Sequence, residues 1–278
     1  MEGGKLWKLE IFSENALSIN LIFDDFYLAT SAKLIIYNKE KSMVMGPITS
    51  EVNNEYKSFS TDIIKGQSIV LELFEPYHAE GTSSLNVTKV IHGYVNLFNT
   101  NFPGVTPGFD ASAPCHNDIN CPVGNPLQEE SYSVAMVLLA NNTRHCSGVL
   151  VSNECQDFTP NFLTAFHCVD VGAGLDFQDG ILSGNEINAS QNWVFRFQYK
   201  SPVCDGGDGN SFFSFVGSTF RSAWRTTDFA LFELNNRPTA NTGITYAGWS
   251  REDTPATSSA GIHHPNGDVM KISIENNL

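Results

Sequence analysis

The chain has 278 residues, 41% of them hydrophobic, which is enough to bury the core of one large or two ordinary domains. Its net charge of −14 and its lack of a basic patch make nucleic acid and anionic membrane surfaces poor partners. No apolar run approaches membrane-spanning length, so we expect no membrane insertion. Frequent Phe (20) and Gly (22), with only 17% charged residues, favour a β-rich protein.

Residues 1–98 read as a series of short strands. Trp7, Leu9 and Ile11 alternate with polar residues, and further apolar runs follow at 17–23, 34–37, 69–73 and 87–97. Turn signals such as Gly46-Pro47 and Lys65-Gly66 separate these runs. The spacing predicts an antiparallel β-sandwich. His78 and His92 are isolated, and we interpret them as ordinary surface or sheet residues.

The stretch 99–114 contains three prolines, two glycines and no lysine or arginine, which is the composition of a linker. We therefore place a domain boundary there. Residues 115–278 again read mostly as strands, with apolar runs at 134–140, 147–151, 193–199 and 228–234. The sequence predicts two packed β units joined by this linker.

All six cysteines lie between positions 115 and 204, and this clustering favours a disulfide framework and an oxidising compartment. A zinc site is the weaker interpretation, because there is no Cys-x-x-Cys pair. The chain shows no signal peptide, and we expect a missing amino-terminal piece to account for that. The cysteines are Cys115, Cys121, Cys146, Cys155, Cys168 and Cys204.

Two segments carry the strongest chemical signal. The first is Leu-Thr-Ala-Phe-His-Cys, which contains His167, and the second begins 61 positions later at Asp228 and runs Asp-Phe-Ala-Leu-Phe-Glu-Leu. A serine protease needs a histidine base and a carboxylate that holds it in the correct tautomer. Alone, His167 would be read as a core or surface residue, and Asp228 as a turn residue. Together, in this order and spacing, they favour a catalytic pair.

No serine in the chain suits the role of nucleophile. Ser147 lies upstream of the histidine, and Ser258-Ser259 lacks the preceding glycine turn that would build an oxyanion hole. Two possible metal sites are also weak. The loop 205–210 lacks the closing glutamate of a calcium-binding loop, and His263-His264 would point to opposite faces of a strand. We therefore assign no metal and no cofactor.

Together these residues resemble the lysyl endopeptidase group of secreted bacterial serine proteases. The similarity covers about residues 111–278, and residues 3–95 resemble the sandwich region that precedes such proteases more diffusely. The landmarks are Cys115 to Pro122, Cys146-Ser147-Gly148, Leu163 to Cys168, Asp228 to Leu231, Ala247-Gly248-Trp249 and Gly261 to Ser273.

The resemblance implies a chymotrypsin-like double β-barrel in which His167 is the general base and Asp228 orients it. It also implies disulfides Cys121–Cys204 and Cys146–Cys168, and a partner for Cys115 beyond the end of this chain. Cys155 has no partner implied by the resemblance. The nucleophile and the acidic residue that selects lysine are expected after position 278, so we expect a chain truncated before its catalytic serine and inactive by itself.

The sequence thus predicts an all-β protein with a sandwich at 1–98, a linker at 99–114 and a protease domain with an incomplete second barrel at 115–278. The expected function of the intact protein is hydrolysis of peptide bonds, after lysine, outside the cell. The substrates are proteins and peptides, and the oligomeric state is open. The alternative is a non-catalytic binding or structural protein on a protease scaffold.

Overall fold

The computed structural model describes residues 3–53, 57, 59–93, 108–140, 143–171, 179–209 and 211–276. The chain divides into two compact units, one made of Met1–Phe98 with Ala140–Asn142 and the other of Asn99–Leu139 with Thr143–Leu278. The predicted linker falls largely on residues outside the described ranges. Each unit is described by itself below.

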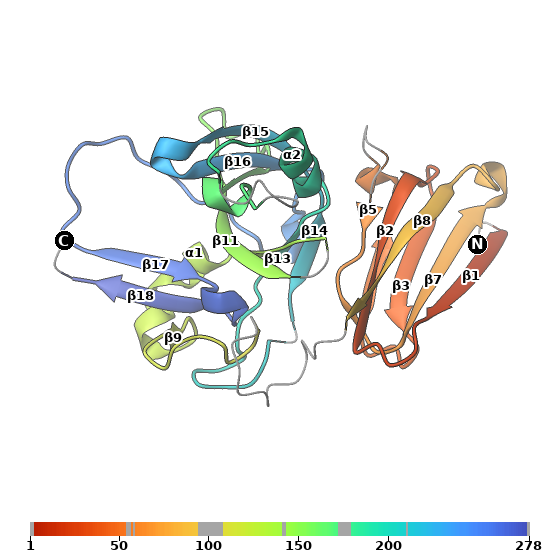
Figure 1. Cartoon of the computed structure of the whole chain (residues 1–278), viewed down its shortest axis with the longest axis horizontal. Helices are drawn as coiled ribbons and strands as arrows, with labels where there is room; N and C mark the ends of the chain where they lie inside the picture. Colours follow the sequence, from red (N-terminus) through yellow and green to blue (C-terminus); the bar gives the residue numbers. More distant parts are fainter. Residues whose placement is uncertain are drawn as a thin grey trace. The chain divides into compact units, whose positions relative to one another are not determined.

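The first unit consists of antiparallel strands arranged in two sheets (Figure 1). One sheet has the order β1 (Gly4–Phe12), β7 (Ser68–Pro76), β3 (Lys33–Asn38) and β4 (Val44–Ile48). In the other, β2 (Ser18–Tyr27) pairs with β5 (Phe59–Ser60), β6 (Ile64–Lys65) and β8 (Ser84–Gly93). Short 3-10 turns, η1 (Ser50–Val52) and η2 (Tyr77–Ala79), connect strands. This is the predicted sandwich.

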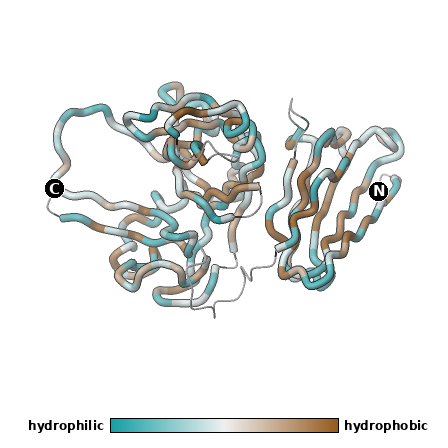
Figure 2. Tube along the Cα trace, in the orientation of Figure 1, coloured by the Kyte–Doolittle hydropathy of each residue, from teal (hydrophilic) through white to brown (hydrophobic). Residues whose placement is uncertain are grey.

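Alternation along the strands builds the core of this unit, and hydrophobic residues follow the strands in Figure 2. Ile19, Leu21 and Phe23 of β2 are fully buried, as are Leu34 and Ile36 of β3. The apolar residues of the run 17–23 that follow Leu17 thus face the core, but Ser18 and Asn20 between them are buried too, so burial does not alternate there.

The first strand departs from the expected burial. Trp7 and Leu9 pair with the buried residues Leu73 and Leu71, and therefore share their face of the sheet, yet both are 53% exposed. The reason is position, because β1 is the outermost strand of its sheet and, within the described ranges, pairs with a neighbour on one side only. An alternating pattern marks the face of a strand, but it does not report whether that face is covered.

The second unit contains a seven-stranded antiparallel sheet and a three-stranded one (Figure 1). The larger sheet has the order β14 (Phe213–Val216), β13 (Val194–Phe197), β10 (Val134–Leu138), β11 (Arg144–Val151), β12 (Asn161–Thr164), β16 (Phe229–Leu234) and β15 (Ser218–Trp224). The smaller sheet has the order β17 (Ser259–His263), β18 (Lys271–Glu275) and β9 (Asn117–Asp118).

Helices are few and short in the described residues of this unit. They are α1 (Gln128–Ser131), α2 (Gly184–Ser190) and the 3-10 turns η3 (Pro122–Leu127), η4 (Phe166–Cys168), η5 (Arg225–Thr227), η6 (Ala240–Thr242) and η7 (Pro265–Gly267). A capping box formed by Ser183 and Glu186 starts α2. In the described part of the chain, no helix is long and apolar enough to cross a membrane.

Aromatic side chains fill the interior of the larger sheet. Phe162 contacts Phe195 edge-on with ring centroids 4.7 Å apart, and Trp193 packs 5.1 Å from Phe232. Aromatic residues alternate with other residues along 193–199, yet every residue of β13 is buried. Arg196 is only 2% exposed, because its guanidinium stacks 4.3 Å from the ring centroid of Phe212. Both faces of β13 are therefore covered.

Two disulfides tie the second unit together. Cys121 is bonded to Cys204 and Cys146 to Cys168, while Cys115 and Cys155 are exposed free thiols in the structure. The strongly bent seven-stranded sheet with a second antiparallel sheet beside it is the all-β, chymotrypsin-like architecture that the sequence predicted.

Candidate active site

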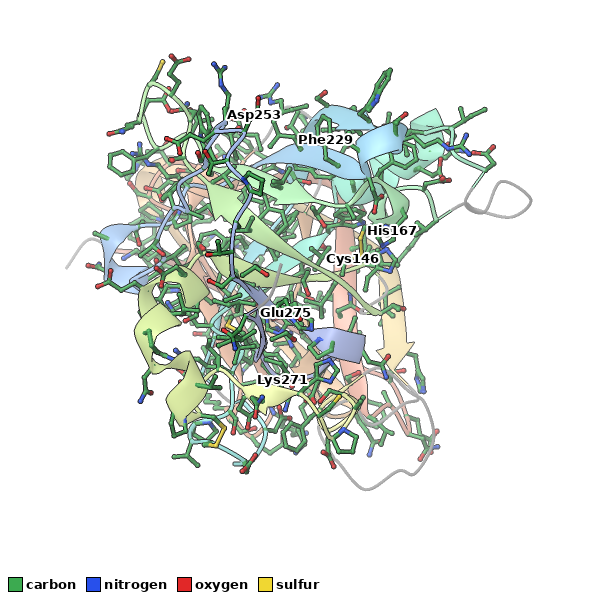
Figure 3. The ribbon with its side chains drawn as sticks, turned by 90° about the vertical axis from the view of Figure 1, so that its left-hand side faces the viewer. Cys146, His167, Phe229, Asp253, Lys271 and Glu275 are labelled. Carbon is green, nitrogen blue, oxygen red and sulfur yellow. A yellow bond between two sulfur atoms is a disulfide. The ribbon has the colours of Figure 1, made fainter. Side chains whose placement is uncertain are left out.

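His167 lies in η4, directly after β12. Its two neighbours point inward, since Phe166 is 7% exposed and Cys168 is 2% exposed. A residue between two buried neighbours in so tight a turn must project its own side chain outward. The side chain of His167 is accordingly 58% exposed, and Figure 3 shows it beside Cys146.

Asp228 sits at the junction between η5 and β16. Its backbone is left-handed, with φ of 50° and ψ of 38°, a conformation that aspartate tolerates better than most residues. The conformation ends η5 and starts β16, which pairs with β12 in antiparallel register. Since His167 follows β12 and Asp228 precedes β16, strand pairing alone brings the two residues together.

Asp228 holds the histidine turn through three hydrogen bonds. Its Oδ2 lies 2.8 Å from the Nδ1 of His167, its Oδ1 accepts the backbone N–H of His167 at 3.0 Å, and its carbonyl accepts the N–H of Phe166 at 3.1 Å. A carboxylate opposite Nδ1 favours the tautomer that carries the proton there. The other ring nitrogen, Nε2, is then free to accept a proton.

The protonation of Asp228 fits this arrangement. Burial raises the pKa of Asp228, but the hydrogen bonds from His167 and Phe166 lower it by more, so the net pKa lies below its ordinary value. The carboxylate therefore remains ionised at neutral pH and can stabilise an imidazolium beside it.

The disulfide between Cys146 and Cys168 anchors the same turn from the other side. It joins β11 to the residue that follows His167. His145 adds a contact, since its Nε2 lies 2.8 Å from the carbonyl oxygen of Cys168. Burial is the main cause that lowers the pKa of His145, and the neighbouring His167 lowers it further. His145 thus remains neutral, and no sequence motif marked it.

The other acidic residues close to His167 in sequence form hydrogen bonds with backbone groups of the loop that follows it. Asp170 is 3% exposed, and its Oδ2 accepts the N–H of Gly180 at 2.8 Å. The Oδ1 of Asp179 accepts the N–H of Ile181 at 2.7 Å. Asp176 lies outside the described residues. Of the described carboxylates, it is Asp228 that contacts the imidazole ring.

The structure places the weaker sequence candidates elsewhere. In the loop 205–210, Oδ1 of Asp208 accepts the hydroxyl of Tyr199 at 2.6 Å. His263 is half-buried beside His116, whereas His264 is buried, with its Nδ1 3.0 Å from the carbonyl oxygen of Asp268. Burial lowers the pKa of His264 to about 4, so it is neutral. The paired histidines do not converge on one point.

Metal binding has little support in the described residues. Two clusters contain three potential ligands within reach of one another, and they are His145 with Cys146 and Cys168, and Cys121 with Cys204 and Asp205. In both clusters the sulfurs are joined as disulfides and are not thiolates that could bind a metal.

Ser147 and Ser258-Ser259 make no hydrogen bond with His167 in the described part of the chain. The hydroxyl of Ser147 accepts the N–H of His264 at 2.8 Å. The Nε2 of His167 faces the Sγ of Cys168 at 3.7 Å, and across the described residues no serine hydroxyl is within hydrogen-bonding distance of it. The described residues thus hold an exposed imidazole whose Nδ1 is paired with the carboxylate of Asp228.

No sequence pattern predicted a buried network of charged side chains in the second unit. Lys271 donates to Asp118 at 2.6 Å and lies 3.5 Å from Asp268, and all three side chains are at most 12% exposed. Burial lowers the pKa of Lys271, but the bond to Asp118 and the two carboxylate charges raise it overall. Asp268 also accepts the N–H groups of Asp110 and Ser112 at 2.8 and 3.3 Å. These partners lie about 150 positions apart, and only the fold brings them together.

The pair formed by His167 and Asp228, and the fold of the second unit, can be compared with known protein families. A family model described as "Lysyl endopeptidase, C-terminal domain" matches residues 109–278, which is more than half of the chain and includes His167, Asp228 and all six cysteines. The chain belongs to the lysyl endopeptidase family of proteases.

Proposed function

We propose that His167 is the general base and Asp228 the orienting carboxylate of a serine endopeptidase that cleaves on the carboxyl side of lysine. The observation that carries this proposal is the 2.8 Å contact between Asp228 Oδ2 and His167 Nδ1, reinforced by two backbone bonds to the same aspartate. The preference for lysine rests on the family alone.

In the proposed mechanism, the neutral imidazole acts through Nε2. As a serine oxygen attacks the substrate carbonyl, Nε2 takes the hydroxyl proton, and it then gives that proton to the departing amine. Water repeats the sequence to release the acyl group. Asp228 remains ionised throughout and stabilises the imidazolium, for which its lowered pKa suits it.

The attacking serine is expected on a segment of the protein other than the described residues. His167 and Asp228 are half-exposed, with 58% and 52% of their side-chain surface accessible, so the pair is not sealed off from another segment. The residue that selects lysine is expected in the same place. No residue of this chain is assigned to either role.

We also propose that 1–98 is an accessory sandwich, that 99–114 links it to the protease domain at 115–278, and that the protein acts outside the cell. Two disulfides support the last point, because such bonds persist in oxidising compartments. Proteins and peptides are the proposed substrates.

The test uses the complete protein that contains this chain. It is incubated with a fluorophosphonate probe for activated serines, and with lysyl, arginyl and leucyl ester substrates. We expect labelling and preferential turnover of the lysyl ester, and we expect His167→Ala to abolish both. His78→Ala, an exposed histidine in the first unit, is the matched control and should behave as the unmodified protein does.

The outcomes separate the proposal from its alternative. Absence of labelling and turnover in the complete protein would favour a non-catalytic scaffold. Turnover that survives His167→Ala would mean that another group is the base. Equal turnover of the arginyl ester would retain the mechanism and remove the specificity for lysine.

A further inference from the structure

The outermost strand of the sandwich presents an unusual surface. Among the strands that the structure describes, β1 has a neighbour on one side only, so the backbone groups of its other edge are unpaired by this sheet. Large apolar residues along it are more than half exposed, and they are Leu6 at 61%, Trp7 at 53%, Leu9 at 53% and Phe12 at 64%. Exposed apolar edge strands are sites at which another strand adds to the sheet.

The register with β7 sorts the residues of β1 onto two faces. Trp7, Leu9 and Ile11 pair with Leu73, Leu71 and Ile69, so they continue the apolar face of the sheet that forms the sandwich core. Leu6, Lys8, Glu10 and Phe12 lie on the opposite face. A strand that adds to this edge must therefore place apolar side chains on the core-facing side. On the other side it must match both a positive charge, from Lys8, and a negative charge, from Glu10.

We propose that the partner of this edge is β1 of a second copy of the chain, paired antiparallel about a two-fold axis at Leu9. In that register Leu9 lies opposite Leu9 of the second copy. Lys8 then lies opposite Glu10 of the second copy, and Glu10 opposite its Lys8. The dimer would join the two edges into one continuous sheet, with both charged pairs on the outer face.

The apolar residues match in the same register. Trp7 lies opposite Ile11 of the second copy, on the core-facing side, and Leu6 lies opposite its Phe12, on the outer side. Aromatic residues opposite aliphatic ones are favourable cross-strand pairs. The register therefore covers the four most exposed apolar side chains of β1 with apolar partners.

Neighbouring registers are disfavoured by charge. A two-fold axis perpendicular to the sheet keeps each residue on its own face, so the register can slip only by two residues at a time. A slip in one direction places Lys8 opposite Lys8 of the second copy, and a slip in the other places Glu10 opposite its Glu10. Like charges directly opposite one another are destabilising. The charges on this strand thus select the register centred on Leu9.

The contacts that Lys8 and Glu10 make within one copy do not block pairing of β1 with a second copy. The Nζ of Lys8 lies 5.6 Å from the ring centroid of Tyr37, and Glu10 accepts the hydroxyl of Ser68 and lies 3.5 Å from the Nζ of Lys39. Lys39 is 71% exposed, and ion pairs that exposed contribute little. All three contacts involve side chains, so they do not occupy the backbone edge of β1.

The test is a charge exchange measured by sedimentation velocity over a range of concentrations. Lys8→Glu alone and Glu10→Lys alone each place like charges at both symmetric pairs, so we expect dimerisation about tenfold weaker or more. The double variant Lys8→Glu/Glu10→Lys restores both pairs and should dimerise as the unmodified chain does. An equimolar mixture of the single variants should form a mixed dimer. Circular dichroism confirms that each variant is folded.

A cross-link tests the two-fold axis directly. Leu9→Cys is introduced with Cys115→Ser and Cys155→Ser, which removes the exposed thiols, and should give a disulfide-linked dimer on mild oxidation. Val44→Cys in the same background is the control, because Val44 is also exposed but lies on β4 at the opposite edge of the sheet.

A chain that is monomeric at all concentrations would overturn the proposal, as would single variants that dimerise as well as the unmodified chain. If the chain is monomeric and the amides of β1 are nevertheless protected from hydrogen exchange in the complete protein, another segment occupies the edge, and the second copy is excluded.

Discussion

Replacing Asp228 with asparagine is the sharpest test of the candidate active site, because it changes one atom of the carboxylate and little of its shape. The Oδ1 of Asp228 accepts a backbone N–H, and the Oδ2 faces Nδ1 of His167 at 2.8 Å. In Asp228→Asn the remaining oxygen can still accept the backbone N–H, and the amide nitrogen then faces Nδ1. That nitrogen is a donor, so Nδ1 must become an acceptor, and the ring proton moves to Nε2.

The expected loss follows from this change of tautomer. With the proton on Nε2, the imidazole cannot take the hydroxyl proton of the serine until it has rearranged. The corresponding substitution in the type case of the triad lowers kcat about 10⁴-fold. At about 1.4 kcal/mol for each tenfold change, that loss corresponds to roughly 5 to 6 kcal/mol of transition-state stabilisation. We expect a loss of similar size here, with KM for a lysyl ester little changed.

The assay compares kcat and KM for the complete protein, for Asp228→Asn and for Asp253→Asn, an exposed aspartate that serves as the matched control. Nitrogen-15 spectra of His167 report which ring nitrogen carries the proton. A kcat for Asp228→Asn within tenfold of the unmodified value would refute the reasoning. A large loss without a change of tautomer would also refute it, since the aspartate would then act in some other way.

Three further predictions concern stability and are measured by urea unfolding. Cys146→Ala opens a disulfide that spans 22 positions, and should lower the free energy of unfolding by about 3 kcal/mol; an unchanged midpoint contradicts this. His264 has a folded-state pKa of about 4, so the unfolded chain binds its proton first as pH falls. Stability should be full above about pH 6.5 and fall towards pH 4 by up to about 1.4 kcal/mol per unit, and His264→Gln should flatten that slope. Lys271→Met leaves two buried carboxylates unpaired and should cost about 3 to 5 kcal/mol, with recovery when Asp118→Asn is added.

The sequence predicted the strands from local patterns, and it predicted the His167–Asp228 pair from two motifs and the spacing between them. Alternation marked β2 and the aromatic strand β13, and the motif around His167 with its aspartate 61 positions later marked the pair that the structure brings to 2.8 Å. The sandwich followed from the number and spacing of such strands, whereas the barrel-like architecture followed from the resemblance to the lysyl endopeptidase group.

Other features could not be predicted, because they depend on which strands become neighbours. The left-handed backbone of Asp228 has no composition signal, since aspartate occurs in many turns. The Asp118–Lys271–Asp268 network joins residues about 150 positions apart. The exposure of Trp7 and Leu9 depends on β1 being an edge strand, and alternation within the strand contains no information about that.

The adjacency of β12 and β16 has a consequence for how the protein is made. Both strands, with His167 and Asp228 between them, lie at or before Leu234, so these strands can pair once the chain has been synthesised to that point. The contacts that hold them are strand pairing, three hydrogen bonds and one disulfide, and all of these lie within residues 146–234. The contacts that hold His167 against Asp228 would therefore require no residue after Leu234, although the disulfide among them forms only where the compartment is oxidising.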